Sequence, residues 1–186
     1  MKLNGRHQLY IQRVIIFIAA QLLFLISNYS LSYAQNVNGC DNYTPSTGQT
    51  VTCSNAYGAS TSGVQTPQNN TGNNNVTVNI DATAQRSING STVGLGSAST
   101  VTNAGTLNTQ SFYYGYGISF GANGRSKAGG NTVNNSGTIT TGGTSADAIH
   151  VESTNASAAA DSITNTGTLT TSGNSCLLYT SPSPRD

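Results

Sequence analysis

The sequence predicts an all-β fold, a right-handed parallel β-solenoid (β-helix) preceded by a signal peptide. Three observations support this: a short motif recurs at nearly constant spacing, strand-like apolar pieces lie between its copies, and only 7% of the residues are charged. Ordinary soluble domains contain roughly 25% charged residues, and disorder usually comes with a high net charge. Here the net charge is +1, which also provides no basic patch for nucleic acid. Abundant Val, Ile and Thr with Asn and Gly turns therefore favour many short strands.

Residues 1–34 have the three parts of a secretory signal peptide. A basic region precedes the apolar run at 14–26, and Ser32-Tyr33-Ala34 supplies a small-x-small cleavage site; the basic residues are Lys2, Arg6 and Arg13. A membrane-spanning helix needs about 20 apolar residues, so this run is short for a span, and an uncleaved anchor is the alternative. We expect the mature chain to begin at Gln35 and to be exported.

Residues 35–75 are expected to form an N-terminal disulfide loop or cap, followed by a flexible segment. Cys40 and Cys53 flank a turn that contains Pro45 and Gly48. In an oxidising compartment this pair is expected to form a disulfide, worth about 3 kcal/mol by the loop-entropy estimate. No His or further Cys lies nearby, and structural zinc needs four ligands, so we expect no metal there. The Asn-, Ser-, Thr- and Gly-rich stretch at 60–75 is expected to be flexible.

The solenoid itself is expected over residues 76–175, where three segments align without gaps. They are VTNAGTLNT from Val101, VNNSGTITT from Val133 and ITNTGTLTT from Ile163, about thirty residues apart. Strand-like pieces at 117–120 and 148–151 separate the copies, and a related piece at 93–95 precedes the first. Each copy has an Asn at its third position and a Gly at its fifth: Asn103, Asn135, Asn165, Gly105, Gly137 and Gly167.

If each repeat is one coil, equivalent residues stack at roughly 4.8 Å. The aliphatic positions then form two inward columns, Val101, Val133 and Ile163 in one and Leu107, Ile139 and Leu169 in the other. The asparagines form a column of amides that can hydrogen-bond as a ladder. The glycines are expected where the chain bends, since glycine tolerates a positive φ. An antiparallel meander or sandwich is the alternative, but it gives no reason for Asn and Gly to recur at one phase.

A signal peptide followed by such repeats resembles the passenger region of bacterial autotransporters. The resemblance covers residues 35–175 and rests on VTNAGTL, VNNSGTITTGG, ADAIHV and ITNTGTLTTSG, with the Cys40–Cys53 loop in support. It implies export by the Sec machinery, passage across the outer membrane with the help of a C-terminal β-barrel, and display at the cell surface or release. Such a barrel needs many alternating strands of about ten residues, and this sequence does not supply them.

Residues 176–186, CLLYTSPSPRD, differ in composition from the repeats and resemble a translated adapter of the kind used in transposase-based sequencing libraries. We therefore expect this tail, with the odd Cys176, to be non-native and to pack on nothing. The solenoid is then truncated within its third repeat, and the gene continues from about Ser175 with further coils, because solenoids need terminal caps. A genuine Pro-rich tail is the alternative.

The sequence predicts no catalytic residue, cofactor or metal. No G-x-S-x-G elbow is present. His150 lies in an alternating strand and is expected to point outward and be exposed. Asp147, Glu152 and Asp161 have no spacing suited to acid–base work. A calcium-type nonapeptide begins at Gly142, but such sites need tandem copies and there is one.

The aromatic stretch SFYYGYGISF is the exception on an otherwise small and polar chain. Tyr113, Tyr114 and Tyr116 are predicted as a contact surface, because exposed tyrosines are rigid and amphipathic. The alternative is that they pack as a lid or against the side of a coil. The resemblance implies a secreted or surface-displayed, non-enzymatic stalk for adhesion to a host or surface ligand. Two other functions stay open: part of a larger hydrolase passenger, and a structural filament exported by a two-partner route.

Overall fold

A computed structural model describes residues 39–58, 60–68, 74–110, 113–153 and 159–174, and the backbone of 179–180. The chain divides into two units, Met1–Gln35 and Asn36–Asp186, and all described residues belong to the second. The expected signal peptide at 1–34 therefore lies outside the described residues. Among the residues that are described, no helix is long and apolar enough to cross a membrane.

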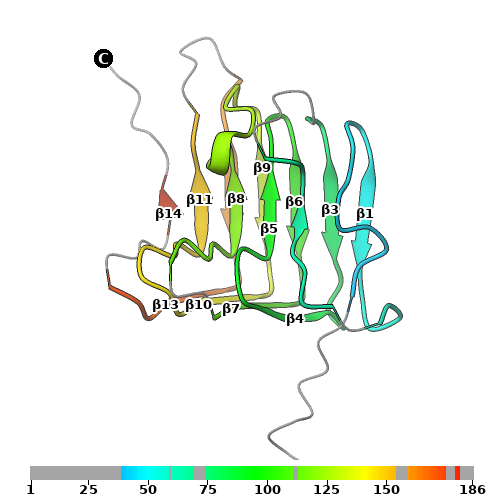
Figure 1. Ribbon diagram of the computed structural model, residues 1–186, viewed down its shortest axis with the longest axis vertical. Helices are drawn as coiled ribbons and strands as arrows, with labels where there is room; N and C mark the ends of the chain where they lie inside the picture. Colours follow the sequence, from blue (N-terminus) through cyan, green and yellow to red (C-terminus); the bar gives the residue numbers. More distant parts are fainter. Residues whose placement is uncertain are drawn as a thin grey trace, which may run out of the picture. The chain divides into compact units, whose positions relative to one another are not determined.

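The strands form three sheets, and every paired strand is parallel to its neighbours (Figure 1). The first sheet contains β1 (Thr50–Cys53), β3 (Thr77–Ile80), β6 (Thr100–Asn103), β9 (Thr132–Asn135) and β12 (Ser162–Asn165). The second contains β4 (Gln85–Ile88), β7 (Thr106–Thr109), β10 (Thr138–Thr141) and β13 (Thr168–Thr171). The third contains β2 (Val64–Gln65), β5 (Val93–Leu95), β8 (Ile118–Phe120), β11 (Ile149–Val151) and β14 (Tyr179–Thr180). This is a parallel β-solenoid, as predicted, and the antiparallel alternative is wrong.

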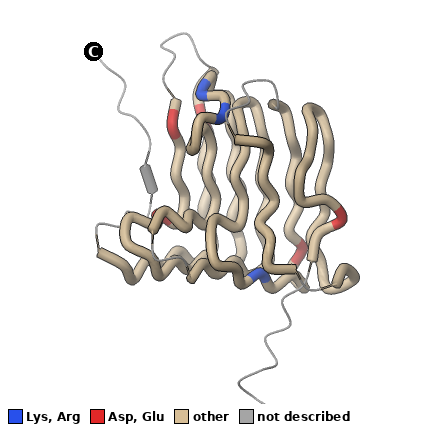
Figure 2. The backbone as a smooth tube through the Cα atoms, viewed as in Figure 1, with Lys and Arg blue, Asp and Glu red and all other residues tan. Residues whose placement is uncertain are grey.

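Successive repeats lie in register because each coil passes through the sheets in the same order. Val101 pairs with Val133, and Leu107 pairs with Ile139, so both predicted inward columns are confirmed. Every second side chain of these strands is buried, and each buried aliphatic side chain contributes about 1.5–3 kcal/mol. Charged residues lie mainly in the connections and not in the strands (Figure 2).

The repeated glycines lie at the bend between the first and second sheets, but for a reason other than the predicted one. Gly105, Gly137 and Gly167 do not have a positive φ, so the prediction on their backbone is wrong. A Cβ at Gly137 would instead lie 2.1 Å from the carbonyl oxygen of Gly105, and one at Gly167 would lie 2.1 Å from that of Gly137. Glycine is required here because consecutive coils approach too closely for a side chain.

The solenoid begins before the expected boundary at residue 76. β1 pairs with β3 and β2 pairs with β5, so part of 35–75 already forms the outermost coil. A disulfide joins Cys40 to Cys53 at the end of β1. Val64 is buried, so the segment around it packs on the solenoid and the expected flexibility is wrong there; residues 69–73 of that stretch lie outside the described residues.

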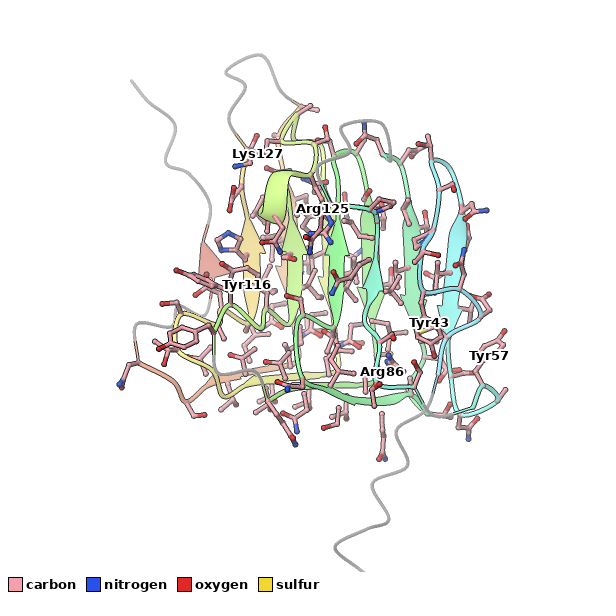
Figure 3. All side chains as sticks on the ribbon, viewed as in Figure 1. Tyr43, Tyr57, Arg86, Tyr116, Arg125 and Lys127 are labelled. Carbon is pink, nitrogen blue, oxygen red and sulfur yellow. A yellow bond between two sulfur atoms is a disulfide. The ribbon has the colours of Figure 1, made fainter. Side chains whose placement is uncertain are left out.

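Arg86 takes a core position that is aliphatic in the later coils. It pairs in register with Leu107 and is 2% exposed. Its guanidinium donates to the carbonyl oxygens of Ser60 and Ser62 and lies 5.4 Å from the ring centroid of Tyr43 (Figure 3). Burial lowers the pKa of Arg86. Because β4 is an edge strand of the second sheet, this guanidinium closes the inward column where the outermost coil contributes no strand to that sheet.

The last described coil is more open than the coils before it. Ile163 and Leu169 are half-buried, whereas Val133 and Ile139 in the preceding coil are fully buried. Tyr179–Thr180 form β14, which pairs with β11. The expectation that nothing in 176–186 packs on the solenoid is therefore wrong for these two residues. An open sheet edge presents free backbone groups that a short extended segment can pair with whatever its sequence.

Candidate functional site

The three asparagines of the repeat stack at the ends of β6, β9 and β12. The side-chain amide of Asn103 donates from Nδ2 to Oδ1 of Asn135 at 2.7 Å, and Asn135 donates in the same way to Asn165 at 2.6 Å. The predicted amide ladder is therefore present. Asn103 and Asn135 are buried and Asn165 is exposed, so the first two amides fix the register between coils and are not open to a ligand.

Two tyrosines stand out from the surface of the solenoid. Among the described residues, Tyr113 and Tyr114 are the exposed large hydrophobic side chains, 69% and 60% exposed. They lie in the segment that connects β7 to β8. Tyr114 has a φ of 48°, a left-handed backbone that is rare for a bulky residue. Such strain persists only where the surroundings fix it, and it is concentrated at functional sites.

Contacts with both neighbouring coils hold this segment. Tyr113 forms a parallel bridge with Thr144 of the following coil, and the backbone N–H of Tyr114 donates to the carbonyl of Thr144 at 3.3 Å. From the preceding coil, the hydroxyl of Ser91 donates to the carbonyl of Tyr114, also at 3.3 Å. The two exposed rings therefore project from a backbone that is already fixed.

Tyr116 does not belong to the exposed surface. It is 7% exposed, and its ring stacks on His150 with centroids 4.2 Å apart and an interplanar angle of 8°. The prediction of Tyr116 as an exposed contact residue is wrong, and packing against the side of a coil is correct for it. The backbone N–H of Tyr116 donates to Ser91 Oγ in the preceding coil. This hydrogen bond holds the residue against the third sheet just before β8. The ring of Tyr114 lies 6.3 Å from that of Tyr116.

His150 lies between two carboxylates. Its Nδ1 is 2.8 Å from Oδ2 of Asp147, and its Nε2 is 3.0 Å from Oε1 of Glu152. Glu152 also forms an ion pair with Lys127. The expectation that His150 is exposed is therefore wrong. Asp147 and Glu152, expected only to lack the spacing for acid–base work, each contact one of its ring nitrogens. The close spacing of the three residues around β11 was the available signal.

Burial and nearby charges shift the pKa values of two residues in this cluster, Tyr116 and Glu152. Burial, with the nearby Asp147, Glu152 and Tyr114, raises the pKa of Tyr116 to about 12. Burial also acts to raise the pKa of Glu152, but hydrogen bonds with Lys127 and His150 outweigh it, so the pKa of Glu152 is lowered.

The cluster is better suited to joining coils than to chemistry. Both ring nitrogens of His150 face carboxylates, so neither is open to a substrate while these contacts hold. The two carboxylates contact different nitrogens of the ring, and the described residues contain no group of three that could hold a metal ion. Tyr116 and Lys127 come from the coil of β8, and their partners come from the coil of β11.

The remaining predicted acid and an unpredicted arginine also make contacts between coils. Asp161 accepts from the backbone N–H and the side-chain amide of Asn131, at 2.8 and 2.9 Å. Arg125 follows the short helix η1 (Ala122–Gly124) and donates to the carbonyl of Thr66 and to Oε1 of Gln65, at 3.0 and 2.9 Å. Burial lowers the pKa of Arg125. Nothing in the sequence indicated this contact, because its partners are far apart along the chain.

Of the residues predicted as a contact surface, the structure therefore leaves Tyr113 and Tyr114 exposed and places Tyr116 beneath them. Cys40 and Cys53 lie in the outermost coil and the amide ladder lies inside, so neither extends this surface. No protein-family model, curated protein or solved structure matches the chain.

Proposed function

We propose that this chain is part of an exported passenger of the autotransporter type, a non-catalytic β-solenoid stalk that makes surface contacts through Tyr113 and Tyr114. The observation that carries the proposal is the exposure of two aromatic rings on a backbone fixed by both neighbouring coils. Tyrosine offers a large amphipathic contact area, and a preformed segment lowers the entropic cost of binding.

The fold supports the stalk part of this proposal. A solenoid extends by repetition, because each coil contacts only its neighbours. The Cys40–Cys53 disulfide suits an oxidising compartment outside the cytoplasm. Export through the Sec machinery and display with the help of an outer-membrane barrel rest on the composition of 1–34 and on the resemblance of the repeats.

Adsorption measurements test the contact role. The full chain is passed over quartz-crystal sensors coated with fibronectin, laminin, collagen or bare polystyrene. We expect adsorption to at least one layer, and we expect it to be lost when Tyr113 and Tyr114 are both replaced by Ala. The control is Tyr57→Ala, which removes a half-buried tyrosine that follows β1 and lies outside the connection between β7 and β8, and it should leave adsorption unchanged.

Two results would count against the proposal. One is a double variant that adsorbs as well as the parent chain, and the other is a parent chain that adsorbs to none of the layers. Export is tested separately by N-terminal sequencing of protein recovered from the periplasm of a Gram-negative host. The expected N-terminus is Gln35, and retention of Met1 on exported protein contradicts the export part.

A further inference from the structure

The outer face of the first sheet carries a regular array of hydroxyl and amide groups. In each strand of this sheet the first and third side chains point outward, and all are exposed or half-buried. All ten of these outward positions are Thr, Ser or Asn: Thr50, Thr52, Thr77, Asn79, Thr100, Thr102, Thr132, Asn134, Ser162 and Thr164.

Strand pairing makes the array two-dimensional. Thr100 pairs with Thr77 on one side and with Thr132 on the other, and the third positions pair in the same register. Equivalent outward side chains on neighbouring strands are therefore roughly 4.8 Å apart. The first positions of the strands form one file across the sheet and the third positions form a second, and the two files are about 6.6 Å apart along the strands. Figure 1 shows β1, β3, β6 and β9 side by side, and Figure 2 shows that these strands carry no charged residue.

The polar groups of this face are not used by the fold. Inward polar side chains of the same coils are committed to hydrogen bonds, such as those of Asn103, Thr109 and Thr141. In the described part of the chain, none of the ten outward side chains forms a hydrogen bond with the protein. The face therefore offers donors and acceptors at fixed spacing, together with the methyl groups of threonine, to whatever lies against it.

We propose that the outer face of the first sheet, referred to below as the threonine face, binds the surface of an ice crystal. Hexagonal ice presents water oxygens at regular intervals, and its shorter repeat is similar to the distance between equivalent side chains on neighbouring strands of this face. A rigid array can hold water in that arrangement before contact, which reduces the ordering cost of adsorption, as for any preorganised surface. Adsorption to a lattice needs neither a pocket nor charge.

A protein partner fits this face poorly. The cores of protein interfaces are enriched in aromatic residues, Met and Arg, and the ten outward positions contain none of these. The second sheet also carries outward threonines, but it has four strands, and on β4 Ser87 is already hydrogen-bonded to Gln110. The inference is independent of Tyr113 and Tyr114, which belong to the connection between β7 and β8.

Ice adsorption is measured directly with the full chain. Thermal hysteresis and the inhibition of ice recrystallisation are recorded in a nanolitre osmometer, and labelled protein is followed onto a growing ice hemisphere. We expect the parent chain to enter the ice, to shape the crystals and to produce a measurable hysteresis. Thr102→Tyr and Thr132→Tyr, made separately, should each remove most of this hysteresis, because a bulky ring in the array prevents close contact with the lattice.

Two controls separate the face from the fold. Ala82→Tyr places the same ring at an exposed turn outside the threonine face and should retain full hysteresis. Circular dichroism should show both threonine variants folded, since tyrosine has a high β-propensity. The proposal is overturned if the parent chain gives no hysteresis and is excluded from the ice, or if Thr102→Tyr and Thr132→Tyr are as active as Ala82→Tyr. Binding to crystalline cellulose in the absence of ice activity also overturns it.

Discussion

Asn103 and Asn135 lie in adjacent coils and are joined through their side chains, with Nδ2 of Asn103 donating to Oδ1 of Asn135 at 2.7 Å. Nδ2 of Asn135 donates in the same way to Oδ1 of Asn165. The central amide is therefore both acceptor and donor, and its loss leaves the buried amide of Asn103 without its acceptor. The repeated asparagine fixes the register of one coil against the next.

Removal of the central amide should destabilise the solenoid. Replacing Asn135 with Ala leaves a buried donor on Asn103 without its acceptor, at a cost of about 1–3 kcal/mol. The matched control is Asn134→Ala, which changes the adjacent outward residue and should shift stability by less than about 0.5 kcal/mol. Urea unfolding followed by circular dichroism compares the two. Equal midpoints for the two variants contradict a structural role for the ladder.

The glycine at the bend should tolerate no side chain. In Gly137→Ala the new Cβ would lie 2.1 Å from the Gly105 carbonyl oxygen, so the coils must separate, at a cost of about 1–3 kcal/mol or more. At Gly142 the nearest atom to an added Cβ is 3.6 Å away, so Gly142→Ala should be close to neutral. Thermal unfolding of the two variants measures the difference, and a Gly137→Ala protein as stable as Gly142→Ala would show that coil spacing does not require glycine.

Arg86 should hold the outermost coil in place. Arg86→Leu restores the aliphatic residue found at Leu107 but removes the donors to the carbonyls of Ser60 and Ser62. We expect faster amide hydrogen exchange in the segment 60–66, with little change around β10. The control is Leu107→Ile, a nearly volume-conserving change in the same column. Unchanged exchange in 60–66 would mean that the guanidinium does not fasten this segment.

Tyr116 should ionise late in an alkaline titration. Its pKa is raised to about 12 by burial and by the nearby carboxylates, from an ordinary value of 10.0. The folded state therefore holds its proton more tightly than the unfolded state does. The stability that this group contributes is complete below pH 10 and is lost as the pH rises from 10 towards 12. Ultraviolet titration of tyrosinate should show a late phase that Tyr116→Phe removes; an unchanged titration in this variant contradicts the burial of Tyr116.

The repeat could be predicted from sequence wherever its signature is complete. VTNAGTL, VNNSGTI and ITNTGTL carry the same Asn, Gly and aliphatic residues in phase, and they give the register that β6, β9 and β12 adopt. The earlier coil of β3, β4 and β5 has the same path but not the signature. Ile80 replaces the asparagine, and Arg86 stands where the later coils have an aliphatic residue. Residues 76–100 were expected within the solenoid, and the piece at 93–95 was recognised, but the repeat could not predict the register of this coil.

Contacts between coils were harder to predict, because their partners are brought together only by stacking. The ring of Tyr116 stacks on His150, and Arg125 donates a hydrogen bond to Gln65. The connections between these residues differ in length from coil to coil, so the repeat does not predict which of them come together. The exposure of Tyr113 and Tyr114 could be predicted from composition, since a polar chain has few reasons to carry adjacent aromatic residues in a connection. The burial of Tyr116 depends on the position of Ser91 in the preceding coil, which the sequence pattern does not reveal.

In-register stacking of the coils is the central claim, since the tyrosine segment and the threonine face both depend on it. The most direct test is the distance between nitroxide labels at Thr50→Cys and Ser162→Cys, in a chain whose Cys176 is replaced by Ser. These positions end the same outward file on β1 and β12, four strand steps apart. Double electron–electron resonance should give a narrow distribution near 19 Å, from four steps of roughly 4.8 Å with the labels side by side. A broad distribution, or a centre beyond roughly twice that distance, contradicts the parallel solenoid.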